Sequence, residues 1–321
     1  MQHYLSIHDI PDLETALQEM AILKQHPLIT NHIGKGKTLG LLFFNSSLRT
    51  RLSTEKAARN LGMEVLILNV DRDSWQLEFE DGVVMDATKA EHIKEAAAVL
   101  SQYCDLLAIR AFPRLQDKAE DEAEQVLSAF AKYATVPIIN MESSTAHPLQ
   151  GLTDAFTITE LAKTKIAQGK KLNVVLSWAP HPKALPHAVA HSFVKTMQRM
   201  DVHFKITHPQ GYELNKQIVG NTPVVYDQKA AVVEADIIYV KNWSSYTEYG
   251  KVVSQDTSWQ VDEALLQAAP QAKVMHCLPV RRNVVIVDAV LDSPASAVIQ
   301  QAGNRTYAAQ YVLQKLLTHG N

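Results

Sequence analysis

The sequence predicts an α/β protein with two domains, each a parallel sheet flanked by helices. Its 321 residues exceed what one ordinary hydrophobic core holds together. Short apolar runs alternate along the chain with segments of helical periodicity. Most of these runs are apolar at nearly every position, which is typical of strands covered by helices on both faces.

The first half of the chain begins with an expected helix over Leu13–Lys24, with Asp12 as its N-cap. The segment "RTRLSTEKAARNLG" also has helical spacing and ends near Gly62, since glycine readily adopts the left-handed conformation that closes a helix. Four buried strands are expected in this half, at 38–44, 63–70, 105–112 and 136–141.

The same alternation restarts in the second half, after an expected helix from about Leu152 to 165. The strand-like segments there lie at 171–179, 202–208, 235–241 and 272–278. A last helix is expected over 303–317. Its pattern does not decide which half it packs on, and we assign it to the first. The expected domains are therefore residues 1–144 with 303–321, and residues 145–302.

Composition and charge argue against several classes of partner. Apolar residues make up 46% and charged residues 20% of the chain, as in ordinary soluble globular proteins. The formal net charge of −3 provides no basic field for nucleic acid or for a membrane surface. No apolar run approaches the roughly 20 residues of a membrane span, and the N-terminus lacks the pattern of a signal peptide. With only Cys104 and Cys277, we expect a cytoplasmic protein without a disulfide framework.

The segment "LLFFNSSLRTR", residues 41–51, places hydroxyls and guanidinium groups where a buried strand ends and a helix begins. The backbone N–H groups at a helix N-terminus favour an anion. Ser47 and Thr50 add hydroxyl donors, and Arg49 adds a two-pronged guanidinium donor. Simple capping by Ser46 or Ser47 accounts for one serine but not for the whole cluster. The segment therefore predicts a phosphate site.

Other expected strands also end in polar or charged residues. In doubly wound sheets, ligands bind beyond the carboxyl ends of the strands. The residues at these ends are Arg110 in "AIRAF", Glu142, His147 and Gln150 in "NMESSTAHPLQ", and His276, Cys277 and Arg281 in "HCLPVRRN". Polar groups at several strand ends favour a common binding site over scattered surface side chains.

Two further clusters have other possible interpretations. His187 and His191 are four residues apart on a probable helix, a spacing that can bind a metal ion. No glutamate lies between them and no third ligand is evident, so the pattern of a zinc hydrolase is not met and we expect no metal. Cys277 lies beside His276, but neighbouring residues of a strand point to opposite faces. We therefore expect a structural or backbone role for Cys277 rather than that of a nucleophile.

Taken together, "SLRTR", "HPLQ" and "HCLP", in this order and at these separations, resemble the aspartate/ornithine carbamoyltransferase family. The resemblance covers essentially the whole chain. Members of this family transfer a carbamoyl group from carbamoyl phosphate to an amine. The resemblance implies that the first domain binds carbamoyl phosphate, that the second binds the amine substrate, and that no cofactor takes part. The phosphate-binding residues that it implies are Ser47, Leu48, Arg49 and Thr50.

The resemblance implies further roles at the same site. It assigns the carbamoyl group to Arg110, His147 and Gln150. The catalytic residues that it implies are Arg49, Thr50, Arg110 and His147. Trp75 resembles a loop residue that binds carbamoyl phosphate in the site of a neighbouring subunit, which implies a homotrimer with shared active sites.

Two segments depart from the family members that act on free ornithine. Those enzymes grip the α-amino group with an aspartate and Ser-Met-Gly, where this chain has "VKNWSSYTEYG", and they lack the long proline-rich "WAPHPKALPHAVAHS". Both departures resemble the branch that carbamoylates N-acylated ornithine. In N-acylated ornithine the α-nitrogen is blocked and neutral. A buried aspartate facing it would lack a charged partner, which is energetically costly. The residues that match those contacting the acylated substrate are Glu142, His181, Lys241, Arg281 and Arg305, with the backbone of Cys277 and Leu278.

The acyl group is suggested by Ala90, which is small and neutral where the resemblance implies a glutamate in the acetyl-specific enzymes. Val285 is likewise apolar where we expect a lysine in those enzymes. Nothing at Ala90 would repel a succinyl carboxylate, so we expect carbamoylation of N-succinyl-L-ornithine, in arginine biosynthesis. N-acetyl-L-ornithine is the alternative substrate. A non-catalytic homologue that binds small anions is a second alternative, although every family motif is present.

Overall fold

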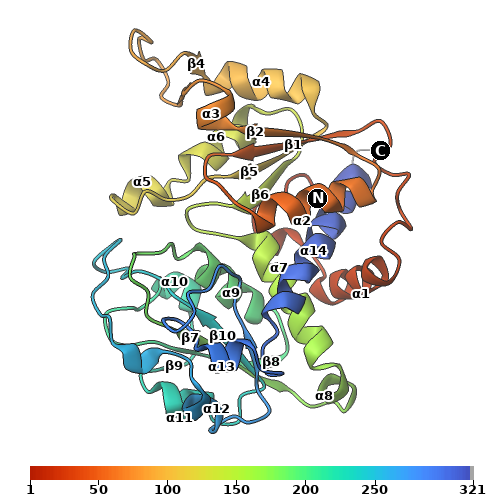
Figure 1. The fold of residues 1–321 in the computed structure, drawn as a ribbon. Coiled ribbons are helices and arrows are strands. Elements are labelled where there is room, and N and C mark those ends of the chain that lie inside the picture. The colour runs from red at the N-terminus through yellow and green to blue at the C-terminus, as the bar shows by residue number, and fades with distance from the viewer. Residues whose placement is uncertain (319–321) are drawn as a thin grey trace. The chain divides into compact units, whose positions relative to one another are not determined.

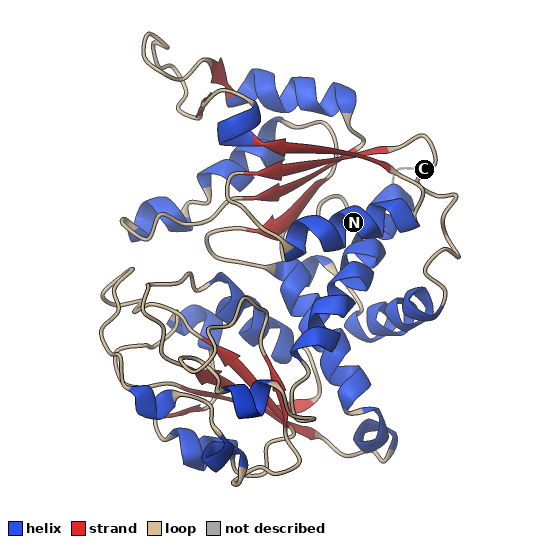
Figure 2. Cartoon of the chain, viewed as in Figure 1, coloured by secondary structure: helices blue, strands red, loops and turns tan. Residues whose placement is uncertain are grey.

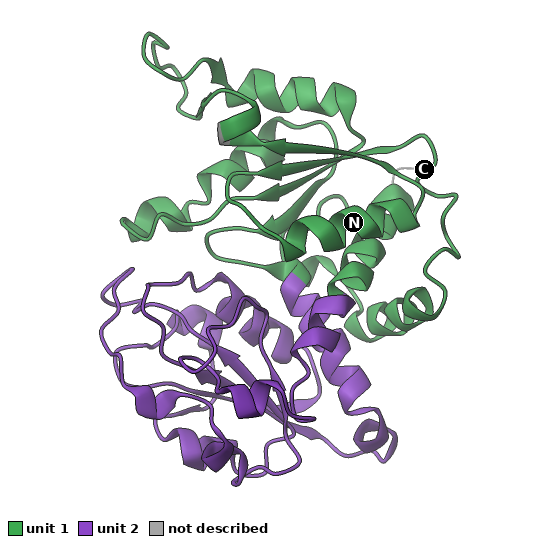
Figure 3. Cartoon of the chain, in the orientation of Figure 1, with its two compact units in different colours: residues 1–149, 305–321 green, residues 150–304 purple. Residues whose placement is uncertain are grey.

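A computed structural model describes residues 1–318, except for the side chain of Asp71. The chain divides into two compact units, Met1–Leu149 with Arg305–Asn321, and Gln150–Asn304 (Figure 3). Helices α7 (Pro148–Leu161) and α14 (Val298–Thr318) each run across a unit boundary. The boundaries therefore fall inside helices, a few residues from the loop positions that the sequence pattern suggested.

The first unit contains a four-stranded parallel sheet in the order β2-β1-β5-β6 (Figure 1). Its strands are β1 (Thr38–Phe43), β2 (Glu64–Asn69), β5 (Leu106–Arg110) and β6 (Ile138–Glu142). The main helices of this unit are α1 (Leu13–Gln25), α2 (Arg49–Asn60), α4 (Ile93–Tyr103) and α6 (Gln125–Tyr133), with the C-terminal part of α14.

Shorter elements complete the first unit. They are a 3-10 turn η1 (Ile7–Asp9), α3 (Val70–Asp73), α5 (Lys118–Glu122), and the two-residue strands β3 (Leu77–Glu78) and β4 (Glu91–His92), which pair with each other. The side chain of Asp12 accepts a hydrogen bond from the backbone N–H of Thr15, which confirms the predicted N-cap of α1.

The second unit contains a five-stranded parallel sheet in the order β11-β10-β7-β8-β9. Its strands are β7 (Leu172–Trp178), β8 (Val202–Thr207), β9 (Val224–Val225), β10 (Ile237–Lys241) and β11 (Lys273–Met275). Its helices, besides α7 and the start of α14, are α8 (Lys163–Ala167), α9 (Ala188–Met197), α10 (Lys216–Val219), α11 (Gln228–Val232), α12 (Glu263–Leu266), α13 (Asp288–Leu291) and the 3-10 turn η2 (Thr257–Trp259).

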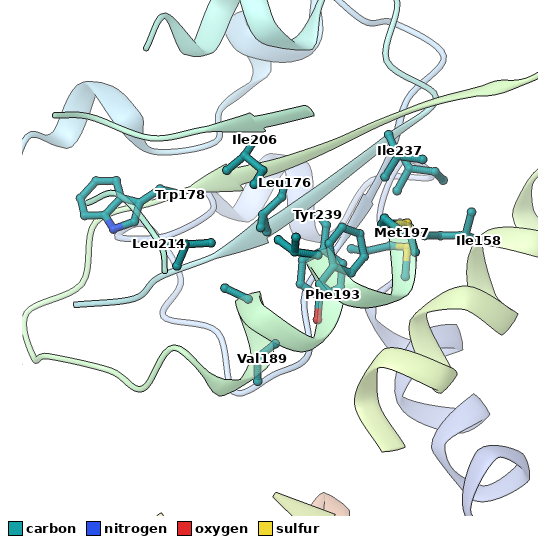
Figure 4. Close-up of a cluster of buried hydrophobic side chains, with 14 of the residues drawn as sticks. Ile158, Leu176, Trp178, Val189, Phe193, Met197, Ile206, Leu214, Ile237 and Tyr239 are labelled. Carbon is teal, nitrogen blue, oxygen red and sulfur yellow. The ribbon is translucent and has the colours of Figure 1, made fainter. Parts of the chain in front are cut away.

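Strand β7 shows why the apolar runs of this chain are continuous. Val174 and Leu176 point into one buried cluster, while Val175 between them packs in another. Figure 4 shows the first of these clusters, where Leu176 lies with Phe193 of α9 and Tyr239 of β10. Both faces of the sheet are therefore covered, as the sequence predicted for a parallel sheet.

The predicted α/β class is confirmed, because parallel strands alternate with helices in both units (Figure 2). The strand predicted at 272–278 is shorter than expected and ends at Met275, so His276, Cys277 and Leu278 lie beyond it. Leu278 has a φ of 57°, which takes the backbone out of the extended conformation after the strand. The short edge strand β9 and the first turn of α14, from Val298, were not predicted.

Within residues 1–318, every helix is either too short or too polar to span a bilayer.

Candidate active site

The N-terminus of α2 lies directly after the loop that follows β1. The helix begins at Arg49, and Leu48 precedes it without a side-chain cap. Oγ of Ser47 accepts a hydrogen bond from the N–H of Thr50 at 3.3 Å, so this serine does bond the first turn, as the capping alternative proposed. Arg49 is partly exposed at the same turn. The local geometry thus combines a helix N-terminus with hydroxyl and guanidinium groups.

Thr50 joins two buried arginines that are far apart in the sequence. Its Oγ1 accepts hydrogen bonds from Nη1 of Arg110 at 3.2 Å and from Nη2 of Arg305 at 2.7 Å. Arg110 ends β5, and Arg305 lies on α14. All three residues are at most 7% exposed. Two buried guanidinium groups thus share one hydroxyl. Their positive charges, little screened by water, attract an anion strongly.

Glu142, at the end of β6, supplies a negative charge beside these arginines. Its Oε2 forms a buried ion pair with Nη1 of Arg110 and lies 3.4 Å from Nε2 of His147. The guanidinium of Arg110 also stacks over the ring of Phe112, with 4.2 Å between Cζ and the ring centroid. Glu142 therefore pairs with Arg110 in the same cluster in which Arg110 and Arg305 share the hydroxyl of Thr50.

His147 is buried beside this cluster. Burial lowers its pKa well below the ordinary value of 6.5, and the charges of Arg305 and then Arg110 lower it further. The imidazole is therefore neutral near pH 7. A neutral ring carries one N–H donor, which suits a hydrogen bond to a carbonyl oxygen better than an electrostatic contact to an anion.

The loop between Glu142 and His147 is held by a residue that the sequence analysis did not single out. Oε1 of Glu124 accepts hydrogen bonds from Oγ of Ser143 at 2.8 Å and from the N–H of Thr145 at 2.6 Å. Glu124 precedes α6 with a φ of 50°, an unusual conformation for a residue with a side chain. Because it lies in the charge run "DKAEDEAEQ", its pattern resembled a solvated helix face and carried no sign of this contact.

Gln150 lies in the second unit, as do five of the residues assigned to the second substrate: His181, Lys241, Cys277, Leu278 and Arg281. Three others assigned to that substrate lie in the first unit: Ala90, Glu142 and Arg305. Nε2 of Gln150 donates a hydrogen bond to Oδ1 of Asp154 at 2.7 Å. Lys241 ends β10 and is 7% exposed, and its Nζ donates to the carbonyl oxygen of Asn242 at 2.7 Å.

His181, Lys241 and Arg281 form a cluster in the second unit, whose positive charge comes from Lys241 and Arg281. Nε of Arg281 donates to Nε2 of His181 at 3.1 Å. Burial is the main cause that lowers the pKa of His181, and the charges of Lys241 and Arg281 also lower it. This cluster gathers three of the residues predicted to meet the acylated substrate, and its charge suits carboxylates.

The two segments that depart from the free-ornithine enzymes are bonded to each other. The N–H of Ser244 donates to the carbonyl oxygen of Leu185 at 3.0 Å, and Nε2 of His187 donates to that of Ser244 at 2.7 Å. Nδ2 of Asn242 donates to the carbonyl oxygen of Ala179 at 2.6 Å. The proline-rich segment and the "NWSSYTEYG" loop thus form one structural feature of the second unit, next to His181 and Lys241.

His276 orients the backbone of the third motif. Its N–H donates to Oε1 of Gln301 at 2.9 Å, and its Nδ1 accepts from the N–H of Leu278 at 2.9 Å. Cys277 lies between them, is partly buried and forms no disulfide. A backbone role for Cys277 and Leu278 fits this turn, since their peptide groups lie just past the sheet.

Trp75 and Ala90 precede the short strands β3 and β4 of the first unit, respectively. Trp75 is 58% exposed, and its Nε1 donates to Oε2 of Glu91 at 2.7 Å. The N–H of Ala90 donates to the carbonyl oxygen of Gln76 at 3.3 Å, and Ala90 is exposed.

Val285 is only 2% exposed and packs in a hydrophobic cluster of the second unit. Its apolar character is therefore also required by the core, and its link to acyl specificity stays a prediction.

His187 and His191 are both buried, with their rings stacked at 5.6 Å between centroids. They pack with Tyr246, whose ring centroid lies 5.5 Å from that of His187. Across residues 1–318, no three His, Cys, Asp or Glu side chains are grouped as metal ligands.

Two family descriptions match the chain. Residues 2–160 match "Aspartate/ornithine carbamoyltransferase, carbamoyl-P binding domain", and residues 186–316 match "Aspartate/ornithine carbamoyltransferase, Asp/Orn binding domain". Together the two matched ranges cover most of the chain.

The chain is similar both to N-succinylornithine and to N-acetylornithine carbamoyltransferases. The chain is 46% identical over 319 residues to the N-succinylornithine carbamoyltransferase of Bacteroides thetaiotaomicron, covering 99% of each protein. It is 36% identical over 336 residues to the N-acetylornithine carbamoyltransferase of Xanthomonas axonopodis pv. citri, covering 98% of this chain and 96% of that protein. A solved N-acetyl-L-ornithine transcarbamylase mutant, glutamate to alanine, complexed with carbamyl phosphate and N-succinyl-L-norvaline, matches with a TM-score of 0.89 and 35% identity, over 98% of this chain and 100% of that chain.

Proposed function

Because the chain belongs to the aspartate/ornithine carbamoyltransferase family, we propose that it transfers the carbamoyl group of carbamoyl phosphate to the δ-amine of N-succinyl-L-ornithine. The products are N-succinyl-L-citrulline and phosphate. The observation that carries the proposal is the buried cluster of Thr50, Arg110 and Arg305 beside the N-terminus of α2. It offers donors and positive charge, as a phosphorylated substrate requires.

In this proposal, the first unit binds carbamoyl phosphate. The N-terminus of α2, with Ser47, Leu48, Arg49 and Thr50, takes the phosphate. Arg110 and His147 meet the carbamoyl oxygen, and Gln150 meets the carbamoyl nitrogen. The buried guanidinium groups of Arg110 and Arg305, both bonded to Thr50, support this assignment. Such preorganised donors stabilise negative charge as it develops on oxygen.

The reaction begins with attack of a neutral δ-amine on the carbamoyl carbon. The new C–N bond forms as the C–O bond to phosphate breaks, and the departing phosphate accepts the proton that the amine loses. A free amine of this kind has a pKa of about 10.4, so the cationic surroundings must favour its neutral form. Neutral His147 donates to the carbamoyl oxygen and Arg110 stabilises the charge that builds there. Holding the two substrates in line lowers the barrier by several kcal/mol.

The second substrate meets the cationic cluster of the second unit. His181, Lys241 and Arg281 offer hydrogen bonds and positive charge to the carboxylates of an N-acylated ornithine. Glu142 and Arg305, with the backbone of Cys277 and Leu278, complete the proposed contacts. The bonded pair of departing segments supports this assignment, since it builds the second unit differently from the pattern expected of free-ornithine enzymes.

The succinyl group is proposed because two observations agree. The curated relative with 46% identity is named N-succinylornithine carbamoyltransferase, whereas the acetylornithine relative shares 36%. Ala90 is neutral, and the solved mutant that holds N-succinyl-L-norvaline has lost a glutamate. The succinyl group carries a second carboxylate, and a negatively charged side chain at this position would repel it.

We also propose a homotrimer in which the exposed Trp75 reaches the site of a neighbouring copy, acting in arginine biosynthesis in the cytoplasm. The test of the activity is direct. The purified protein is incubated with carbamoyl phosphate and, separately, with N-succinyl-L-ornithine, N-acetyl-L-ornithine, L-ornithine and L-aspartate, and the carbamoylated products are measured. A higher kcat/KM for N-succinyl-L-ornithine is expected. Preference for the acetyl substrate would reassign the acyl group, and no product with any amine would favour the non-catalytic homologue.

A further inference from the structure

A buried carboxylate links two glutamines in the second unit. Asp154 lies on α7 with a side chain that is fully buried. Its Oδ1 accepts hydrogen bonds from Nε2 of Gln150 and from Nε2 of Gln301, each at 2.7 Å. Burial of a carboxylate is costly unless its oxygens are hydrogen-bonded. The two amides supply such bonds, and no role has been given to Asp154 so far.

The direction of these hydrogen bonds is dictated by the backbone. The N–H of His276 can only donate, and Oε1 of Gln301 accepts from it at 2.9 Å. The opposite end of the Gln301 amide, its NH2 group, therefore faces Asp154, and Oδ1 of Asp154 must act as an acceptor.

The same acceptor decides the orientation of Gln150. Because Oδ1 of Asp154 accepts, Gln150 must present its NH2 group to it. The oxygen and the nitrogen of a side-chain amide point in different directions, so Oε1 of Gln150 is turned away from Asp154. A chain of fixed polarity thus runs from the backbone of His276, through Gln301 and Asp154, to Gln150.

We propose that Asp154 is a positioning residue that makes Gln150 present its carbonyl oxygen, rather than its NH2 group, to the carbamoyl group. The inference rests on the proposed function, in which Gln150 meets the carbamoyl nitrogen. That nitrogen is an NH2 donor and needs an acceptor. A reversed Gln150 would oppose two NH2 groups and lose the hydrogen bond.

The experiment compares carbamoyl phosphate with acetyl phosphate, which has a methyl group in place of the NH2 group. The KM for carbamoyl phosphate and the inhibition constant of acetyl phosphate are measured for each protein with the same amine substrate. The wild type is expected to prefer carbamoyl phosphate. Asp154→Ala removes the carboxylate and leaves space for a water molecule. Because water can donate or accept a hydrogen bond, either end of the Gln150 amide can then face it, and the orientation of Gln150 is no longer fixed. The preference is expected to fall about tenfold, equal to about 1.4 kcal/mol.

The loss should be confined to the ligand with the NH2 group. In Asp154→Ala, the affinity for acetyl phosphate is expected to stay within about twofold of the wild type, since no acceptor is needed there. Asp154→Asn keeps an oxygen acceptor and is expected to retain most of the preference. Gln150→Met removes the amide and is expected to lose the preference as Asp154→Ala does.

A matched control separates orientation from packing. Asn304 on α14 donates to Oγ1 of Thr157 on α7 at 2.9 Å and to Oε2 of Glu160 on the same helix at 2.8 Å. Asn304→Ala should lower the melting temperature and leave the ligand preference unchanged. If Asp154→Ala does not fold, Asp154→Ser replaces it, because its short hydroxyl also leaves room for water.

The outcomes are distinct. Equal weakening of both phosphates in Asp154→Ala, or an unchanged preference in it, would overturn the inference, and the same holds for Asp154→Ser where it replaces the alanine variant. A preference that survives in Gln150→Met would also overturn it, even if neither Asp154→Ala nor Asp154→Ser folds. A wild-type protein that carbamoylates no amine would instead overturn the proposed function.

Discussion

Replacing Thr50 with valine removes one buried hydroxyl and leaves the shape of the side chain almost unchanged. Oγ1 of Thr50 accepts from Arg110 at 3.2 Å and from Arg305 at 2.7 Å, and Thr50 is 2% exposed. Valine presents a methyl group at this position. Both guanidinium groups therefore lose an acceptor inside the first unit.

The expected loss of stability comes from these two contacts. Leaving a buried donor without its acceptor costs roughly 1–3 kcal/mol. The contact of Arg305 is the shorter one, while Arg110 keeps its ion pair with Glu142. We expect Thr50→Val to lower the free energy of unfolding by about 2–3 kcal/mol. For a unit of this size, the melting temperature should fall by roughly 4–12 °C.

Thermal and urea unfolding without ligand measure this loss, and two variants control it. Thr50→Ser keeps the hydroxyl and should stay within about 1 kcal/mol of the wild type. Thr54→Val makes the same change one turn later on α2, at a residue that is also 2% exposed but does not bond the arginines. Equal losses for Thr50→Val and Thr54→Val would refute the role of Thr50 as the shared acceptor.

Four further predictions concern the proposed site. Arg49→Ala should lower kcat/KM roughly 100-fold through loss of a charge-assisted phosphate contact, with little change in melting temperature; an unchanged KM and kcat for carbamoyl phosphate would contradict the phosphate site. Mixing inactive Trp75→Ala with inactive Arg110→Ala subunits should restore partial activity, and hybrid trimers that form but stay inactive would disprove shared sites. Ala90→Glu should shift the ratio of kcat/KM from N-succinyl-L-ornithine toward N-acetyl-L-ornithine by like-charge repulsion, which a constant ratio would exclude. Burial and two neighbouring guanidinium groups keep the pKa of His147 in the folded protein below 6.5. Below that pH the unfolded chain binds a proton that the folded chain does not, so the free energy of unfolding should fall as the pH falls, by up to about 1.4 kcal/mol per pH unit. His147→Gln should reduce this slope, as measured by urea unfolding at a series of pH values.

Local pattern was sufficient where a single segment carries the signal. The continuous apolar run 38–44 predicted β1 because both faces of a covered parallel strand are buried. The start of α2 after this strand followed from "SSLRTR" in the same way. Each of these features depends on neighbours within a few residues, and periodicity reports such neighbours well.

Pattern alone failed where burial or extent depends on distant packing. The strand predicted at 272–278 stops at Met275, because the chain turns at His276–Leu278 and bonds Gln301 instead of continuing the sheet. Val285 follows two arginines and an asparagine, and nothing local indicates that it packs in the core. Glu124 looked like one more charge on a solvated helix, since its partners Ser143 and Thr145 lie in another loop.

The sequence by itself determined the α/β class, the order of strands and helices, and the family to which the three motifs belong. Only the tertiary structure decided which side chains meet. Thr50 and Arg305 are 255 positions apart, and their hydrogen bond exists because α14 returns to the first unit. Asp154 and Gln301 are 147 positions apart, so the polarity passed to Gln150 has no signature in spacing. Periodicity records which face of an element is buried, whereas a hydrogen-bond partner is selected by the packing of elements that are remote along the chain.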